Sequence, residues 1–226
     1  MHQPIKVIIT GATGMVGEGV LHECLQSEAV TSVLIINRRP SGRVHSKLTE
    51  IVHENFMDVT PLMQAVSGYD ACFFCLGVSS MGKKETQYYR LTYNLTIGFA
   101  RLLSAQNPGI TFCYVSGAGT DSSEKGRLMW ARVKGKTENA LLQMPFKAVF
   151  LFRPAIITPT KGLKNTLKLY HYFGWLIPIF RWLMPNSICS LSAIGRAMIQ
   201  VAIAGNEKKV LEVRDIKQLA ASYHKT

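Results

Sequence analysis

Hydrophobic residues along the chain gather in short continuous runs, such as "IKVIIT", "SVLIIN" and "ITFCYVS". An apolar run without alternation is typical of a strand that is buried on both faces, as in a parallel sheet covered by helices. The run "LTEIVHENF" is a weaker example of the same kind. The predicted strands cover residues 5–10, 32–37, 48–56, 70–77, 110–116 and 147–154.

The stretches between these runs carry apolar residues at helical spacing, which predicts helices. The shortest begins with Pro61 and ends with Gly68, and these two residue types favour the start and the end of a helix. The predicted helices cover residues 14–27, 61–68, 86–106 and 124–144. Regular alternation of strand and helix predicts an α/β fold with a doubly wound parallel sheet. Ligands of such sheets bind beyond the carboxyl ends of the strands.

The pattern changes after about residue 155. The following stretch is apolar and basic, and Pro178 and Pro185 interrupt it before it reaches the about 20 apolar residues of a membrane-spanning helix. Residues 190–205 then predict an amphipathic helix, and "KKVLEVRDIKQLA" predicts a last short strand and helix. We therefore expect a first domain of residues 1–157. Residues 158–226 would form a small substrate-side lobe packed on it, within a single compact unit.

A glycine pattern follows the first predicted strand, in "IKVIITGATGMVGEGV". Glycines at this spacing allow a sharp turn, a close approach of backbone to a pyrophosphate, and tight helix–sheet packing. The helix that follows offers free N–H groups and a partial positive charge to an anion. We interpret the pattern as a dinucleotide-binding loop, the alternative being a purely structural turn. The predicted loop residues are Gly11, Thr13, Gly14, Met15, Val16 and Gly17.

The second predicted strand ends in "INRRP", at the place where proteins that prefer NAD usually carry an acidic residue for the ribose. Asn37 stands there, and Arg38 and Arg39 follow it. Two guanidinium groups can pair with a ribose 2′-phosphate, and this stretch has no carboxylate to repel it. The hypothesis is therefore NADP(H) in preference to NAD(H). The alternative is that both arginines are merely solvated.

Two further segments are predicted to line the cofactor. Asp58 would accept a hydrogen bond from the adenine amino group, with Val59 donating from its backbone. In "CLG", the segment Cys75, Leu76 and Gly77 ends a strand where the cofactor would pass close to the backbone.

Taken together, these motifs resemble the short-chain dehydrogenase/reductase superfamily. The likeness is to its extended and atypical branches, which include the NAD-dependent epimerase/dehydratases and the Tat-interacting-protein type of NADP-binding oxidoreductase-like proteins. It covers about residues 5–157 and implies a Rossmann-like sheet. The motifs that carry it, in order, are "GATGMVG", "NRR", "FMDV", "CLG", "YVSGAG", "VKGKTEN" and "LFRPAIIT".

The resemblance implies a catalytic serine, tyrosine and lysine. Ser116 matches the serine and Lys134 the lysine, which in the superfamily holds the nicotinamide ribose. Trp130 stands at the tyrosine position, four residues before Lys134 and on the same helical face. An indole N–H donates a hydrogen bond but does not titrate usefully, so Trp130 cannot act as the general acid. The resemblance also implies backbone contacts to the nicotinamide from Pro154, Ala155 and Ile156.

The missing acid leaves two functional hypotheses open. One is an NADP(H)-dependent oxidoreductase or epimerase-like enzyme for a small carbonyl or hydroxyl substrate, with an altered catalytic set. Substitute donors would then be Lys134 itself or a tyrosine among Tyr88, Tyr89 and Tyr93, although packing of the helix is the favoured interpretation of the tyrosines. The other is a catalytically inactive NADP(H)-binding sensor or regulatory partner.

The charge of the chain adds a third and weaker interpretation. Lys and Arg number 26 against 14 Asp and Glu, a formal net charge of +12. Such a balance favours anionic partners, and segment 161–184 combines a basic face (Lys161, Lys164, Lys168) with apolar residues, as in peripheral membrane contact. The positive residues are scattered, with no like-charge run longer than two, which disfavours a nucleic-acid partner.

The cysteines and histidines indicate compartment and metal content. There are five cysteines, and the N-terminus lacks the features of a secretory leader, so we expect free thiols and a cytoplasmic location. Cys72 and Cys75 form a CxxC inside an apolar strand, which favours burial over redox pairing. The histidines show no ligand spacing, and no metal site is predicted. By resemblance, helices 86–106 and 124–144 would pair across a homodimer.

Overall fold

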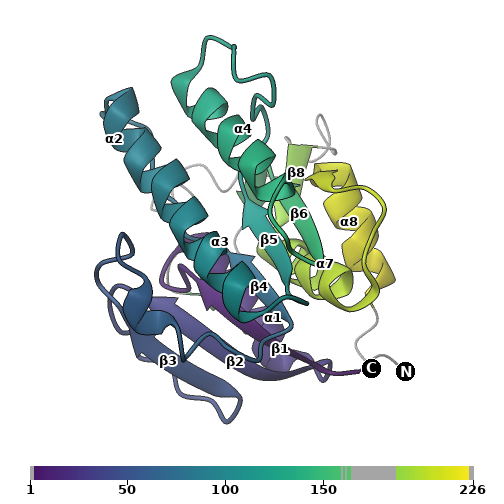
Figure 1. Ribbon diagram of the computed structural model, residues 1–226. Coiled ribbons are helices and arrows are strands. Elements are labelled where there is room, and N and C mark those ends of the chain that lie inside the picture. Colours follow the sequence, from purple (N-terminus) through teal and green to yellow (C-terminus); the bar gives the residue numbers. More distant parts are fainter. Residues whose placement is uncertain (1–2, 159, 161, 164–186, 224–226) are drawn as a thin grey trace.

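The computed structural model describes residues 3–158, 160, 162–163 and 187–223 (Figure 1). Its centre is a seven-stranded sheet of order β3-β2-β1-β4-β5-β6-β9, in which every neighbouring pair is parallel. The strands are β1 (Ile5–Thr10), β2 (Val30–Asn37), β3 (Leu48–Val52), β4 (Ala71–Phe74), β5 (Thr111–Val115), β6 (Ala148–Arg153) and β9 (Val210–Glu212). The predicted doubly wound, Rossmann-like α/β fold is thereby confirmed.

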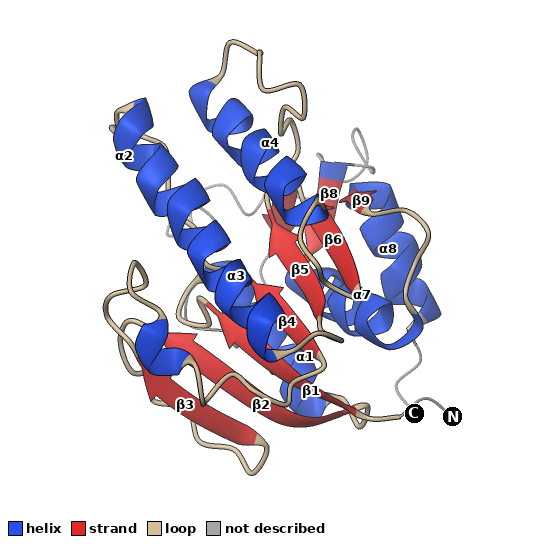
Figure 2. Cartoon of the chain, in the orientation of Figure 1, coloured by secondary structure: helices blue, strands red, loops and turns tan. Residues whose placement is uncertain are grey.

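Helices cover both faces of this sheet (Figure 2). On one face α1 packs on α7 and α7 on α8, and on the other α3 and α4 run side by side. The helices are α1 (Met15–Gln26), α2 (Glu85–Tyr89), α3 (Leu95–Gln106), α4 (Met129–Leu142), α7 (Leu191–Ala204) and α8 (Val213–Ser222). A π-helical turn, η2 (Arg90–Asn94), joins α2 to α3, so the predicted helix 86–106 is continuous but not uniform.

Alternate residues of the central strands enter two separate cores. In β1, Val7 and Ile9 face the α1 and α7 side, whereas Ile8 packs with Phe99 of α3 on the other side. All of these side chains are almost fully buried. The strands therefore read as continuous apolar runs because both of their faces are covered.

The strand order reverses between β1 and β4, so the loops after these two strands diverge and leave a crevice at their carboxyl ends. The glycine loop follows β1, and Cys75–Gly77 follows β4. The sequence motifs assigned to a cofactor therefore meet at the place where such sheets bind ligands.

The described C-terminal residues complete the same sheet. The strand β9 pairs with β6, and a second, two-stranded sheet joins β7 (Ile156–Thr158) to β8 (Ile188–Ser190). The predicted helix 190–205 and the final strand and helix are confirmed, whereas β7 and β8 were not predicted. The proposed boundary at residue 157 stays a prediction, and most of segment 161–184 lies outside the described residues.

Four predicted elements differ in extent by more than two residues. The predicted strand 70–77 ends at Phe74. The third strand ends at Val52, not at residue 56. Residues 61–68 form only the short 3-10 turn η1 (Thr60–Leu62) followed by further turns, because so short a stretch gains little from helix propagation. Helix α4 begins at Met129, not at 124, because the Asp121 carboxylate folds the preceding residues into a turn that places Glu124 at a φ of 60°.

Candidate functional site

The glycine loop is shaped by contacts that only glycine permits. Gly11 has a φ of +72°, and a Cβ at this position would lie 2.8 Å from the Leu76 Cα. A Cβ on Gly17 would lie 2.2 Å from the Gly11 carbonyl oxygen. The Gly14 amide donates to that same oxygen at 2.9 Å, and Gly14 begins α1 without a capping side chain. The first amides of α1, from Met15 to Gly17, are thus left to an anion.

Two buried oxygens beside this loop add to its fit for a ligand. Within the described residues, Thr10 Oγ1 and Asn37 Oδ1 are the buried side-chain polar atoms that lack a hydrogen-bond partner. They lie at the ends of β1 and β2, and Asn37 lines a groove of about 180 Å³. The groove brings together Gly11, Thr13, Gly14, Asn37, Arg38, Cys75, Leu76 and Gly77. A cofactor crossing the crevice along this groove would follow the predicted residues.

The arginines after β2 line a larger cavity of about 890 Å³ together with Thr13 and Ser41. Arg38 and Arg39 are both exposed, as an arginine that meets a phosphate from solvent must be. The sequence-based statement that no carboxylate lies here needs correction, because Glu18 and Glu54 line the same cavity. The sequence did not reveal them because they lie outside the "INRRP" motif.

A further carboxylate, Glu50, fixes the path of the loop that carries Arg38 and Arg39. Glu50 of β3 accepts hydrogen bonds from Asn37 Nδ2 at 2.9 Å and from the Ser41 amide at 2.8 Å. The Ser41 hydroxyl donates to its other oxygen at 3.0 Å. Glu50 therefore fixes the amide orientation of Asn37 and the path of the loop, a role that the sequence pattern did not indicate.

The predicted catalytic residues surround a cavity of about 540 Å³ at the other end of the crevice. Ser116 follows β5, and Trp130 and Lys134 come from α4. The remaining lining includes Gly14, Met15, Val16, Cys75, Gly77, Pro154 and Ala155. The glycine loop, the predicted catalytic residues and the segment after β6 thus line one cavity. Ile157, and not the predicted Ile156, belongs to its lining.

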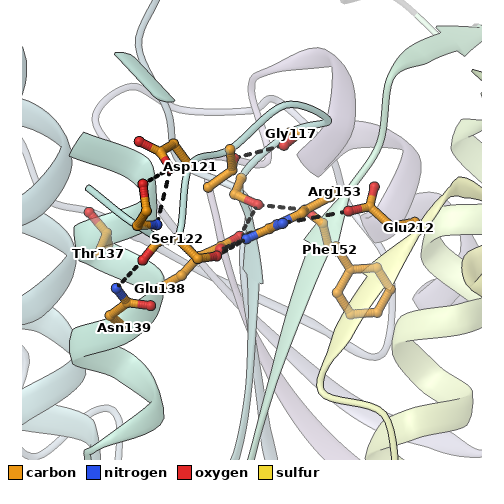
Figure 3. Close-up of polar contacts among 12 residues, drawn as sticks. Gly117, Asp121, Ser122, Thr137, Glu138, Asn139, Phe152, Arg153 and Glu212 are labelled. Atoms are coloured by element: carbon orange, nitrogen blue, oxygen red, sulfur yellow. Dashed lines mark hydrogen bonds and ion pairs between the residues drawn. The ribbon is translucent and has the colours of Figure 1, made fainter. Parts of the chain in front are cut away.

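The hydroxyl of Ser116 is committed to the protein. It is 5% exposed and donates to Glu138 Oε1 at 2.5 Å, one helical turn beyond Lys134. Glu138 is itself buried and is paired with Arg153, whose Nε donates to Oε1 at 3.0 Å (Figure 3). Arg153 also reaches Ser122 Oγ at 2.6 Å and Glu212 at 3.6 Å. In this arrangement Ser116 has no proton to offer a substrate oxygen.

Lys134 is half-buried, and its amine donates to the backbone carbonyl of Ser116. Burial lowers the pKa of Lys134 to about 8, against the opposing effect of the Glu138 carboxylate. Loss of hydration destabilises an ammonium group, which explains the direction of the shift. A lysine of this kind exchanges protons close to neutral pH.

The tyrosines of the long helix do not line the cavity around Trp130. Tyr88 is 2% exposed, and burial raises its pKa. Tyr89 and Tyr93 stack at a ring separation of 4.7 Å, and the Lys136 amine lies 5.5 Å from the Tyr89 ring. Packing, the favoured interpretation of these tyrosines, is confirmed.

Asp58 and Val59 are not brought into the cavities described above. The Asp58 side chain accepts the Thr60 amide at 3.1 Å and so holds the turn after β3. Val59 packs against the core on the α3 side. Their contact with adenine stays a prediction, as does that of Ile156, which is 38% exposed.

The described cysteines are all free thiols, and no group of three metal-ligating side chains occurs among the described residues. Cys72 of β4 packs in the core on the α3 side, and Cys75, just after β4, packs against the core on the opposite side. Burial raises the pKa of Cys75 to about 12. Nor does any helix in the described part of the chain combine the length and apolarity needed to cross a membrane.

Comparison with known proteins decides the family. Residues 7–122, just over half of the chain, match the NAD-dependent epimerase/dehydratase family. The chain belongs to this family. Epimerase/dehydratases are short-chain dehydrogenase/reductases that bind a nicotinamide dinucleotide, so the resemblance inferred from the motifs and the coarse cofactor prediction are both confirmed.

Relatives of this chain include two proteins of similar size. Protein FMP52, mitochondrial, of Eremothecium gossypii is 24% identical over 225 residues, which cover 96% of either chain. Protein HTATIP2 of Rattus norvegicus is 26% identical over 154 residues, 67% of this chain and 62% of that protein. Among solved structures, the Bordetella bronchiseptica enzyme WbmG in complex with NAD and UDP has a TM-score of 0.67 at 12% identity, over 98% of this chain and 78% of that one.

The predicted cytoplasmic location was wrong. Relatives of the FMP52 type are named mitochondrial proteins, in Eremothecium gossypii as in two further fungi. The prediction rested on the missing features of a secretory leader, which argue only against the secretory route.

Proposed function

We propose that the protein binds NADP(H) in preference to NAD(H). Support comes from the cavity in which Arg38 and Arg39 lie beside Thr13 of the glycine loop, where an adenosine ribose would be held. Arginine pairs with a phosphate through two parallel hydrogen bonds, an interaction that NADH cannot offer at its ribose. The residues proposed for the pyrophosphate are the amides of Met15, Val16 and Gly17.

We further propose that the nicotinamide end lies in the cavity of Trp130 and Lys134. The bound cofactor would supply or accept a hydride at the carbon of a carbonyl or hydroxyl substrate. Lys134, whose pKa burial lowers to about 8, is the proposed proton donor in place of the absent tyrosine. Trp130 would stack on the nicotinamide or donate a hydrogen bond. The protein is then an oxidoreductase or epimerase-like enzyme with an altered catalytic set.

The second candidate is a catalytically inactive NADP(H)-binding sensor. One observation favours it. The Ser116 hydroxyl, which would otherwise hold a substrate oxygen, donates its hydrogen bond to Glu138 Oε1 at 2.5 Å. With Trp130 at the tyrosine position, neither of the two hydroxyl groups that the superfamily uses would then face a substrate.

Titration of cofactor-free protein with NADPH and with NADH tests the cofactor proposal, followed by nicotinamide fluorescence. We expect tight NADPH and weak NADH binding. In the Arg38→Ala, Arg39→Ala double variant, NADPH should lose much more affinity than NADH. Equal losses would refute the assignment of these arginines to the 2′-phosphate.

Turnover separates the enzyme from the sensor. Oxidation of NADPH that depends on an added carbonyl compound supports the enzyme. If a carbonyl panel gives no turnover with the wild type but gives turnover with Trp130→Tyr, the protein is a sensor built on a lost active site. Trp130→Phe is the matched control, since it keeps an aromatic ring without a hydroxyl.

A further inference from the structure

An ion pair between a buried carboxylate and a half-buried arginine lies in the arginine-lined cavity, apart from the two arginines that the motif predicts. Glu18, in the first turn of α1, is 1% exposed and pairs with Arg43 of the loop after β2. Both residues line the cavity of Arg38 and Arg39. Neither was singled out by the sequence pattern, because they are 25 residues apart in the chain.

The position of Glu18 is costly for a phosphate-binding site. A carboxylate is usually favoured at the positive N-terminus of a helix. Here the same helix end would receive the cofactor phosphates, and the carboxylate would repel them. A buried carboxylate also needs a cation. Arg43 supplies it, and this contact uses only part of a guanidinium that carries five N–H donors. The Arg43 side chain is 31% exposed, so it remains accessible to a second anion.

The loop holds Arg43 in this place before any ligand arrives. The Ser41 hydroxyl donates to Glu50 of β3 and accepts the Arg43 amide at 3.3 Å. The loop is thus tied to β3 through Ser41 and to α1 through the Arg43 side chain. Preorganisation lowers the entropy lost when a side chain binds its ligand.

We propose that Arg43 is a third specificity-determining residue, which contacts the ribose 2′-phosphate of NADP(H), and that Glu18 is its positioning residue. The inference rests on the proposed NADP(H) preference. Arg38 and Arg39 are exposed, whereas Arg43 is half-buried and contacts Glu18 in the first turn of α1. The cavity then offers three guanidinium groups against the two carboxylates of Glu18 and Glu54.

The test is a mutant cycle made of Arg43→Gln, Glu18→Gln and the double variant, each titrated with NADPH and NADH. A hydrogen bond to a charged group predicts that Arg43→Gln weakens NADPH on the order of 10- to 100-fold. NADH, which lacks the 2′-phosphate, should change far less. Arg101→Gln is the matched control, since Arg101 is exposed on α3 and lines none of the described cavities.

The double variant distinguishes a ligand contact from mere neutralisation. If Arg43 binds the phosphate, its loss weakens NADPH in the Glu18→Gln background as well. Recovery of wild-type affinity in the double variant would mean that Arg43 only neutralises Glu18, and would overturn the inference. An equal loss for NADPH and NADH would overturn it too, since it would place Arg43 at the shared pyrophosphate.

Two controls keep this result separate from other failures. Circular dichroism checks that each variant is folded. If Arg43→Gln does not fold, Arg43→Lys takes its place. Lysine keeps the charge but not the planar guanidinium, so this variant should lose part of the NADPH affinity. If wild-type protein binds neither cofactor, the proposed function fails. If the wild type prefers NADPH and Arg43→Gln leaves that preference unchanged, only this inference fails.

Discussion

Replacement of Glu138 by glutamine should destabilise the protein far more than the same replacement of Glu85. Both glutamates pair with an arginine, but their surroundings differ. The Glu138 side chain is 1% exposed and its partner Arg153 12%, whereas Glu85 is 52% exposed and its partner Arg132 26%. The pair of variants therefore changes one charge in each case and isolates the effect of burial.

The magnitude follows from what each carboxylate accepts. Glu138 Oε1 receives Ser116 and the Nε of Arg153, and Oε2 receives Nη2 of Arg153. A glutamine amide has a single oxygen, so one of these donors faces an NH₂ group. Removing one partner of a buried pair costs about 3–5 kcal/mol, and we take the lower end because Arg153 keeps Glu212 and Ser122. The exposed pair of Glu85 contributes about 0–1 kcal/mol.

Thermal unfolding measured in parallel by circular dichroism and calorimetry checks this. For a chain of this size, about 3 kcal/mol corresponds to a fall in Tm of roughly 6–12 °C, against at most roughly 4 °C for Glu85→Gln. Equal shifts for the two variants would refute the view that Glu138 is the buried polar centre of the site. A Glu138→Gln variant more stable than wild type would refute it as well.

Two further predictions concern the glycine loop and Lys134. Gly17→Ala should lower the free energy of unfolding by about 1–3 kcal/mol or more and abolish cofactor binding, because the added Cβ would lie 2.2 Å from the Gly11 carbonyl oxygen. The control Gly98→Ala in α3 places its Cβ where no atom lies within 4 Å, and it should raise the free energy of unfolding in denaturant by about 0.5–1 kcal/mol. Burial lowers the pKa of Lys134 from 10.5 to about 8, so its charge opposes folding in full below pH 8 and ceases to do so as the pH rises to 10.5. Wild-type stability relative to Lys134→Met should therefore rise across that window by up to about 3 kcal/mol, and a flat difference in pH-dependent unfolding would contradict the shift.

The layout of the sheet could be predicted from sequence because its signal is local. Strands buried on both faces are continuous apolar runs, and β1, β5 and β6 fall within a residue or so of their predicted limits. The glycine loop could be predicted equally well, since a backbone constraint requires glycine at these positions. The ends of elements were harder to predict. The turn that precedes α4, for example, depends on hydrogen bonds that the Asp121 side chain accepts from Ser123 and Gly126.

The hydrogen-bonding partners of three carboxylates could not be predicted in the same way. Glu18, Glu50 and Glu138 each stand inside a helix or strand pattern that explains them as ordinary polar positions. Their partners lie 25, 13 and 15 residues away, on other elements. Such pairs follow from strand order and loop path, which become visible only in the folded chain.

The two ends of the crevice differ in how ready they are for a ligand. At the proposed adenosine end, the exposed arginines line the larger cavity, and the buried Asn37 oxygen beside the neighbouring groove lacks a hydrogen-bond partner. At the proposed nicotinamide end, Ser116 is bonded to Glu138, and Lys134 to the Ser116 carbonyl. On the proposed function, cofactor binding would need little rearrangement of the described side chains, whereas catalysis would need the Ser116 hydroxyl to leave the Glu138 carboxylate. The proposed enzyme would then bind its cofactor without substrate, and would react only with a substrate that offers Ser116 a better acceptor than Glu138.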